Sequence, residues 1–331
     1  MKRIKYSIVF LLLFVMLLPS WGLTIKIASL APANTPWDDA MRQIAKKWYE
    51  ISDGKIVVKI YPGGIAGDEI DVIRKMRLGQ LQGAVLSSVG LNKIEPELMT
   101  MGLPLITQTD EEVIYLLERM GPRWSKLLED KGMVPVAWQL AGWVSFFTRT
   151  PAYSPEELRA LKLRSYPDEP EMNQTFKEFG FNVVPIPQNE VLSALQTGMV
   201  DAAYAPPVLA ATLQWFGIAN HYNTLRFAPV VGGLVIDKRT WNRIPQEYRE
   251  DFIKAASEVA KDLNDKVIEV DKKAIEIMKQ NGLIVHEATE KEIQEWQSLA
   301  KKGLDRLADN LFSRELYEEV LAVIKEYREK K

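Results

Sequence analysis

Short runs of alternating apolar and polar residues alternate with segments of helical spacing in the first part of the chain. Residues 23–29 (LTIKIAS) alternate and predict a strand, while 38–51 carries apolar residues three and four apart and predicts a helix. A strand at 55–61, a helix at 68–78 and a buried strand at 83–87 follow in the same order. Strands that alternate with helices predict a largely parallel sheet with helices on its faces.

The same order of elements returns later in the chain. The hydrophobic pattern predicts strands and helices in alternation, at 161–166, 171–179, 182–186, 189–197 and 199–204. A constant offset of 119 residues pairs similar residues of the two halves: Asp71 with Glu190, Val72 with Val191, Met76 with Leu195, Gly79 with Gly198 and Leu81 with Val200. This repeat predicts two similar lobes, although the common pattern of α/β proteins can also produce such a match by chance.

The segment that follows is too long for one small lobe. An apolar strand is expected at 230–236, and 245–280 then reads as a helix without a Gly or Pro after its first residue. About 35 helical residues span ~50 Å, so this helix either kinks or bridges both lobes. Charged amphipathic helices close the chain, the last at 311–327. We therefore expect one lobe to comprise 23–141 and 229–265, and the other 142–228 and 266–331.

The extreme N-terminus has the pattern of an export signal. Lys2, Arg3 and Lys5 precede an 11-residue apolar run at 8–18, and small residues follow at Ser20 and Gly22. This order predicts a signal peptide at 1–22, cleaved near Gly22, and therefore a periplasmic protein. The alternative is a single membrane anchor, for which the apolar run is short. Because the chain has no Cys, it cannot be a lipoprotein anchored through a lipidated N-terminal Cys.

Composition excludes several classes of chemistry. The 331 residues include 42 Lys and Arg against 44 Asp and Glu, which gives no electrostatic case for binding nucleic acid. No Cys and only two His leave no expected metal site, and no phosphate-binding glycine loop or Gly-x-Ser-x-Gly motif is present. We expect no cofactor and no catalytic residue. Two lobes without catalytic groups suit a binding protein that closes on a ligand.

One set of motifs resembles a known family. The matching residues are Tyr153-Ser154-Pro155-Glu156-Glu157-Leu158, Leu161-Lys162-Leu163-Arg164, Pro185, Glu190-Val191, Ala194-Leu195-Gln196-Thr197-Gly198, Val200-Asp201-Ala202 and Pro206. They resemble the dicarboxylate-receptor family of solute receptors that serve TRAP (tripartite ATP-independent periplasmic) transporters. The resemblance implies an α/β, periplasmic-binding-protein-like fold of two lobes around a cleft. Each lobe would have a mixed, mostly parallel sheet flanked by helices, and a long helix would span both.

The same resemblance assigns the central ligand contact to Arg164. In this family an Arg in the strand after the Ser-Pro-Glu-Glu-Leu helix grips the ligand's carboxylate. A planar guanidinium suits that task because it can donate two parallel hydrogen bonds, which Lys cannot reproduce. The alternative is a structural Arg that pairs with a nearby carboxylate such as Asp168.

The chain departs from the family pattern at three polar positions. Val144 stands where many members have a second Arg, Ala205 replaces the Asn before Pro206, and Ser87 follows the third strand where an acidic or polar residue is common. Motif position also places two aromatic residues, Trp143 and Tyr204, near the cleft, while Phe146 and Phe147 could equally be core. These changes predict a ligand less polar than a dicarboxylate, namely a monocarboxylate with an apolar body.

The resemblance also implies the partners. The receptor would deliver its ligand to a TRAP-type membrane permease, and some members with apolar clefts are associated with a helical-repeat accessory protein. Two other classes stay open from the residues alone. One is a periplasmic protein that signals to a membrane sensor or scaffolds a complex, and the other, less favoured, is an exported enzyme.

Overall fold

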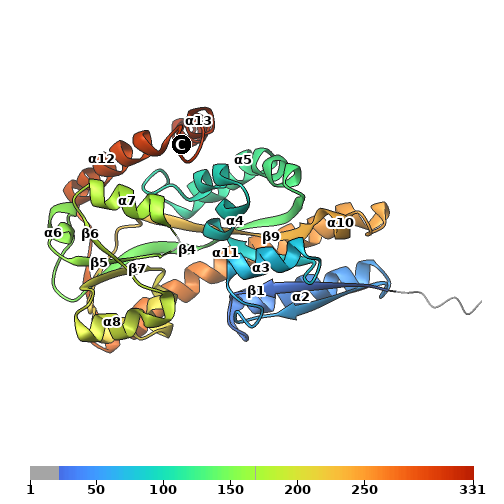
Figure 1. Cartoon of the computed structure of the whole chain (residues 1–331), viewed down its shortest axis with the longest axis horizontal. Helices are drawn as coiled ribbons and strands as arrows, with labels where there is room; N and C mark the ends of the chain where they lie inside the picture. The colour runs from blue at the N-terminus through green and yellow to red at the C-terminus, as the bar shows by residue number, and fades with distance from the viewer. Residues whose placement is uncertain (1–21, 168) are drawn as a thin grey trace, which may run out of the picture.

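The computed structural model describes residues 22–167 and 169–331. Two lobes lie side by side along the long axis of the molecule, with strands and one long helix passing between them (Figure 1). The predicted signal peptide lies outside the described residues, apart from Gly22 at its end. No helix of the described part is both long and apolar enough to cross a membrane.

The first lobe is built from the first predicted group of strands and helices. It contains β1 (Leu23–Ser29), α2 (Pro36–Ile51), β2 (Ile56–Tyr61), α3 (Glu69–Arg77) and β3 (Gly83–Ser87). The strands β1, β2 and β3 are parallel, and β1 lies between the other two. Every predicted element of this group is confirmed, with bounds that differ by no more than two residues.

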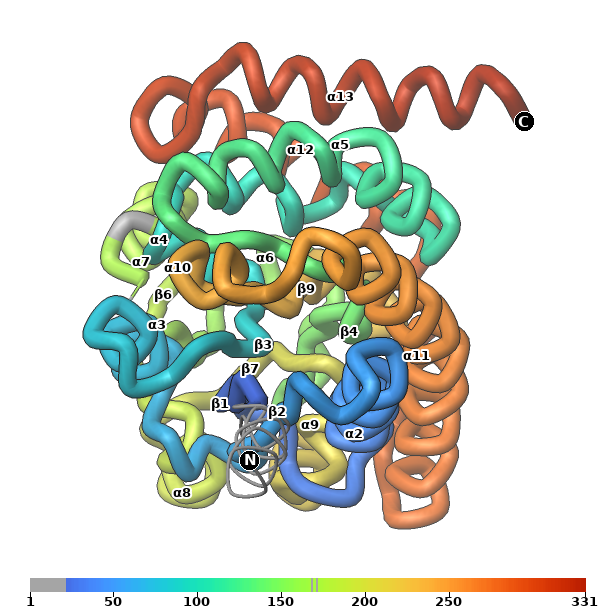
Figure 2. The backbone as a smooth tube through the Cα atoms, turned by 90° about the vertical axis from the view of Figure 1, so that its right-hand side faces the viewer, coloured from blue at the N-terminus to red at the C-terminus, as the bar shows by residue number. Residues whose placement is uncertain are grey.

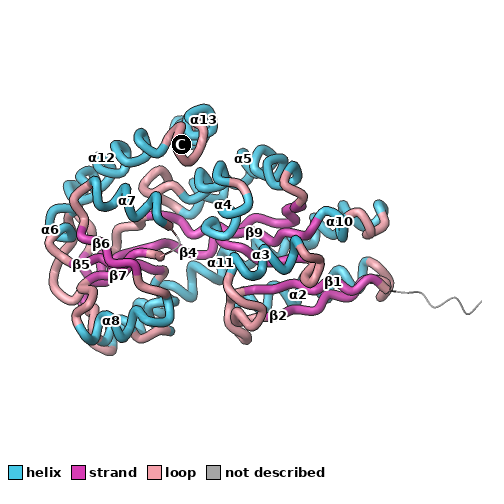
Figure 3. Tube along the Cα trace, viewed as in Figure 1, coloured by secondary structure: helices cyan, strands magenta, loops and turns pink. Residues whose placement is uncertain are grey.

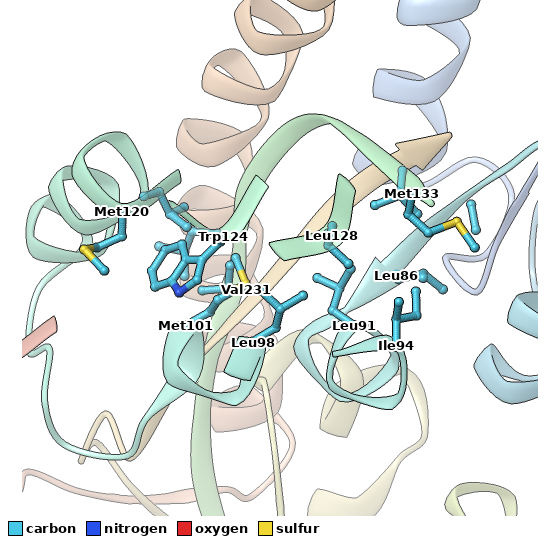
Figure 4. Packing of buried hydrophobic residues seen from close by; sticks show 14 of the residues in the cluster. Leu86, Leu91, Ile94, Leu98, Met101, Met120, Trp124, Leu128, Met133 and Val231 are labelled. Carbon is cyan, nitrogen blue, oxygen red and sulfur yellow. The ribbon is translucent and has the colours of Figure 1, made fainter. Parts of the chain in front are cut away.

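Shorter elements and one long helix complete the first lobe. They are α4 (Ser88–Ile94), the 3-10 helix η1 (Pro96–Gly102), α5 (Asp110–Asp130) and α10 (Lys238–Trp241). Figure 4 shows Trp124 of α5 beside Leu98 and Met101 of η1, and Leu128 of α5 beside Leu91 of α4, in one buried core. The Trp124 indole N–H donates to the Thr100 hydroxyl at 3.1 Å, so the polar edge of this buried ring is also satisfied.

The second lobe repeats the plan of the first. Its elements are α6 (Pro155–Arg159), β5 (Lys162–Ser165), α7 (Pro170–Glu178), β6 (Asn182–Pro185), η2 (Gln188–Glu190), α8 (Val191–Thr197), β7 (Ala202–Ala205), α9 (Pro207–Thr212), η3 (Trp215–Gly217), β8 (His221–Asn223), β10 (Ile284–His286) and α12 (Glu290–Leu307). The strand predicted at 199–204 begins only at Ala202, because Gly198 ends α8 in the left-handed region and a turn follows.

Three long elements belong to both lobes. They are the strands β4 (Met133–Thr148) and β9 (Ala228–Asp237) and the helix α11 (Gln246–Gln280). The sheet order is β2-β1-β3-β9-β4-β7-β5-β6, so each lobe contributes the same three-strand arrangement on either side of β9 and β4 (Figure 3). Gly83 and Ala202, the first residues of β3 and β7, are 119 residues apart, which is the offset of the sequence repeat.

The helix α11 bridges both lobes, which was one of the two alternatives that its length left open. Phe252, Val259 and Val267 lie in the core of the first lobe, while Ile275 and Met278 pack into a core of the second. The helix therefore spans both lobes, as the sequence predicted, and runs along one side of the molecule (Figure 2).

The last helix, α13 (Arg314–Glu329), packs against the first lobe. Its apolar face, with Leu316, Val320 and Ile324, joins the core that α5 and η1 form. The helices α13 and α5 lie beside each other in Figure 2. The domain prediction had placed all of 266–331 with the second lobe. The hydrophobic pattern gave the amphipathic face of α13 but could not show which lobe would cover it.

Candidate functional site

The candidate site is centred on Arg164 of β5. This strand pairs with β6 on one side and with β7 on the other, so it is an interior strand of the sheet. Leu163 packs into an apolar core, and strand alternation puts Arg164 on the opposite face. Equivalent strand pairings in the two lobes place Arg164 where β1 has Ala28, so the charge occurs in the second lobe only.

The Arg164 side chain is fully buried, with 0% of its surface exposed. Its Nε–H donates to the backbone carbonyl of Ile186 at 3.0 Å. Neither Nη atom has a hydrogen-bond partner among the described residues. A buried cation with two free donor atoms is costly unless an anion meets it, because burial removes the water that would solvate it. The arrangement suits a carboxylate that accepts two parallel hydrogen bonds.

One aromatic ring lies against the guanidinium, and further rings continue from it. Its central carbon lies 3.6 Å from the centre of the Tyr166 ring, so the two planar groups are in contact. Tyr166 in turn meets Tyr204 at 5.8 Å between ring centres. Tyr204 continues to Phe146 at 6.1 Å and to Phe176 at 6.4 Å. The structure therefore connects Arg164 with Tyr204 through Tyr166.

Further polar groups near Arg164 also lack partners. The Oγ of Ser165 and the Nε2 of Gln188 are buried and have no hydrogen bond among the described residues. Gln188 begins η2, two residues after the carbonyl that holds Arg164. The structural alternative for Arg164 was an ion pair with Asp168, which lies outside the described residues.

Three of the predicted site residues lie where β4 passes into the second lobe. Val144 is half-buried and pairs with Ala228, the first residue of β9. Ala205 is the last residue of β7, pairs with Ser145 and is 1% exposed. Pro206 follows it and lies beside Gly142 of β4.

Trp143 has neighbours of its own. Its indole N–H donates to Asp110 Oδ1 at 2.6 Å, and the Arg226 guanidinium lies 5.1 Å from its ring centre. Arg226 also pairs with Asp110 Oδ2 at 3.3 Å. Because both ring and N–H are engaged and the side chain joins the core of the first lobe, Trp143 fixes the junction of the lobes. Phe146 and Phe147, which the sequence left undecided, are both fully packed in cores of the second lobe.

Ser87 belongs to the first lobe. It ends β3, caps α4, and its N–H and hydroxyl both donate to the carboxylate of Glu69, at 2.6 and 2.8 Å. An acidic group is thus present beside this position after all, supplied by α3 rather than by β3. The structure does not place Ser87 in contact with Arg164, because the two lie in different lobes.

The residues around Arg164 that the sequence analysis missed are Tyr166, Phe176 and Gln188, whereas Ser165 lies on the opposite face of β5 by strand alternation. A signal existed for the first, since Tyr166 follows Arg164 by two residues in the same motif. Nothing in the hydrophobic pattern distinguishes Gln188 from an exposed residue at the start of a helix. A cavity of about 20 Å³ in the first lobe, between α2, α11 and the sheet, lies elsewhere and has room for about one water molecule.

Comparison with known proteins identifies the class. Residues 27–310 match the family model described as bacterial extracellular solute-binding protein, family 7, and the chain belongs to this family. Members are the substrate-binding receptors of TRAP transporters, and they are receptors rather than enzymes. The resemblance drawn from the motifs around Arg164 is thereby confirmed.

Individual relatives are distant but cover most of the chain. A TRAP periplasmic solute-binding protein from Ochrobactrum anthropi has a TM-score of 0.86 and 24% identity, covering 94% of this chain and 98% of its own. A second, from Xanthobacter autotrophicus, was solved with bound β-D-galacturonate; it has a TM-score of 0.82 and 21% identity, covering 91% and 99%. The C4-dicarboxylate-binding periplasmic protein of Rhodobacter capsulatus is 24% identical over 301 residues, 87% of each chain. These structures confirm the two-lobed fold.

Proposed function

We propose that this periplasmic TRAP receptor binds a small monocarboxylate with an apolar body and delivers it to a membrane permease. The observation that carries the proposal is the buried Arg164 guanidinium, whose two Nη atoms have no partner among the described residues. A ligand carboxylate would supply both hydrogen bonds and the compensating charge. Acid ligands also fit the relatives, one of which holds galacturonate and another of which is named for C4-dicarboxylates.

The apolar part of the proposal rests on what surrounds the charge. Tyr166, Tyr204 and Phe176 present rings near Arg164, while Val144 and Ala205 offer hydrocarbon where many family members have polar groups. One buried cation balances one carboxylate, and a second carboxylate would enter without a matching charge. A monoacid whose body packs on rings and aliphatic side chains meets both conditions.

The first experiment identifies the ligand. Native mass spectrometry of protein purified without unfolding reports any acid that co-purifies, and thermal-shift screening against monocarboxylates and dicarboxylates ranks candidates. We expect stabilisation by monocarboxylates with aromatic or aliphatic bodies. Stronger stabilisation by dicarboxylates would contradict the apolar proposal but leave the receptor function intact. Co-purification of a helical-repeat protein would reveal an accessory partner.

Variants of Arg164 then test the site. Arg164→Ala should weaken binding of the identified acid by about 2–5 kcal/mol, roughly 30-fold to several-thousand-fold, because the ligand charge stays buried and unpaired. Arg164→Lys should restore only part of the affinity. Asp168→Asn is the matched control, since it should leave affinity unchanged if Arg164 serves the ligand. Unchanged binding in a folded Arg164→Ala protein would refute the proposed role.

A further inference from the structure

The junction between the lobes contains a carboxylate that the ligand site does not use. Asp271 lies in α11 between Val267, in the core of the first lobe, and Ile275, in a core of the second. Its Oδ1 accepts the backbone N–H of Val208 in α9 at 3.0 Å. No ion pair to Asp271 occurs among residues 22–167 and 169–331.

The other oxygen of this carboxylate packs against β4 at one of its two irregular points. The pairing of β4 with β9 shifts register between Leu140 and Trp143, and Gly142 has a φ of +120°. A Cβ atom at Gly142 would lie 2.9 Å from Asp271 Oδ2, so the carboxylate rests directly on the glycine backbone. Asp271 therefore joins the three elements that would move if the lobes rotate: α11, β4 and α9.

Few positively charged groups near Asp271 can compensate for burial of its negative charge. β4 and α9 carry no charged side chain. The ionisable groups nearest to Asp271 from other elements are Asp110 at the start of α5, Tyr222 of β8 and Arg226. Arg226 is already paired with Asp110, which adds a like charge near Asp271. On its own helix, the adjacent charged residues are exposed to solvent: Glu269, Lys272 and Lys273. The apolar residues of α2 pack with Phe252 to Val267 of α11, in the first-lobe half of that helix.

We propose that Asp271 is a proton-sensitive hinge residue, whose protonation favours the packed arrangement of the lobes seen here and whose ionisation favours an arrangement that hydrates the carboxylate. Burial raises the pKa of Asp271 to about 6 from its ordinary 3.8, with Asp110 adding to the rise and the Val208 N–H and Arg226 opposing it. A difference of this size shifts the balance between packed and hydrated arrangements by at most ~160-fold. The receptor would thus sense the pH of its surroundings at the junction and not at the ligand.

The natural absence of Cys makes a direct test possible. Cys introduced at Lys46 of α2 and Lys291 of α12, whose side chains are 77% and 87% exposed, can carry a fluorescent donor and acceptor on the two lobes. The distance between labels is measured in the ligand-free protein between about pH 4.5 and 8. We expect the distance to change with a midpoint near pH 6, to do so equally in the control Glu269→Gln, and to become independent of pH in Asp271→Asn.

Two results would overturn the proposal. One is a distance between the labels that stays constant with pH in the parent protein. This measurement does not depend on whether the Asp271 variants fold. The other is an unchanged pH response in Asp271→Asn, which would assign the effect to another group such as His221 or His286. If Asp271→Asn does not fold, Asp271→Ser replaces it, because a hydroxyl can still accept the Val208 N–H.

Discussion

The central carbon of the Arg164 guanidinium lies over the ring of Tyr166, 3.6 Å from the ring centre. The ring supports one face of the guanidinium, while the Ile186 carbonyl fixes its Nε. Both contacts leave the two Nη atoms free in the plane of the group, which is the geometry that a carboxylate needs. Tyr166 is therefore a positioning residue for the proposed ligand contact.

Substitution of Tyr166 should distinguish the contribution of its ring to ligand affinity from that of its hydroxyl. Tyr166→Phe should retain affinity for the ligand within a few-fold, because the stacked ring remains. Tyr166→Leu should weaken binding by ~1–2 kcal/mol, since the guanidinium loses a desolvated cation–π contact and becomes less fixed. Calorimetric titration with the identified acid measures both. Equal affinities for the Leu and Phe variants would show that the stacking is incidental.

Val144→Arg tests why the site should prefer monoacids. A second cation beside the junction should shift preference toward diacids and weaken binding of an apolar monoacid, because it places a charge against hydrocarbon. Val144→Ile, which adds only a methylene group, is the matched control. The ratio of affinities for a monoacid and a diacid of equal length is the readout. A ratio that does not change would mean that residue 144 is remote from the ligand.

The pH dependence of stability should report Asp271. Its pKa is raised to about 6 in the folded protein from 3.8. Its stabilising contribution is therefore complete below pH 3.8 and is lost as the pH rises through 6, by ~3 kcal/mol at most. Urea unfolding at several pH values should show this loss in the parent protein and in Glu269→Gln, and a flatter profile in Asp271→Asn. Parallel profiles for the parent and Asp271→Asn would contradict the raised pKa.

Gly142→Ala should destabilise the protein by about 1–3 kcal/mol. The φ of +120° strains any other residue, and the new methyl group would meet Asp271 Oδ2. Removing the carboxylate by Asp271→Ala should relieve the steric part but not the backbone strain. A double-mutant cycle of unfolding free energies measures the steric contribution between residues 142 and 271. Strict additivity would show that the two residues do not touch in solution.

A buried carboxylate adds a charged contact to the apolar docking of α13 on the first lobe. Glu112 of α5 is 5% exposed and accepts from Arg328 at 2.7 and 3.1 Å. Arg328→Ala should cost ~3 kcal/mol of unfolding free energy, because it leaves this carboxylate without its cation. Arg123→Ala should cost under ~1 kcal/mol, since Arg123 meets Glu315 and Glu319 only at the surface. Similar costs for both variants would contradict a special role of the buried pair.

The sequence by itself determined the local elements and the family. Alternation predicted β1 to the residue, and a short apolar run predicted β3 as a buried strand with the same bounds. The offset of 119 residues matched the starts of β3 and β7, because the hydrophobic pattern is a local property. The motif around Arg164 identified the family, and the length of the helix predicted at 245–280 favoured a helix that bridges both lobes over one that kinks.

Tertiary structure alone decided where these elements meet. It placed α13 on the first lobe, buried Arg164 with two free nitrogens, and brought Asp271 onto Gly142 from a position 129 residues later in the chain. None of this follows from periodicity, because burial, desolvation and close approach depend on residues far apart in sequence. The proposed ligand contact of Arg164 and the proposed hinge role of Asp271 both depend on neighbours that only the fold supplies.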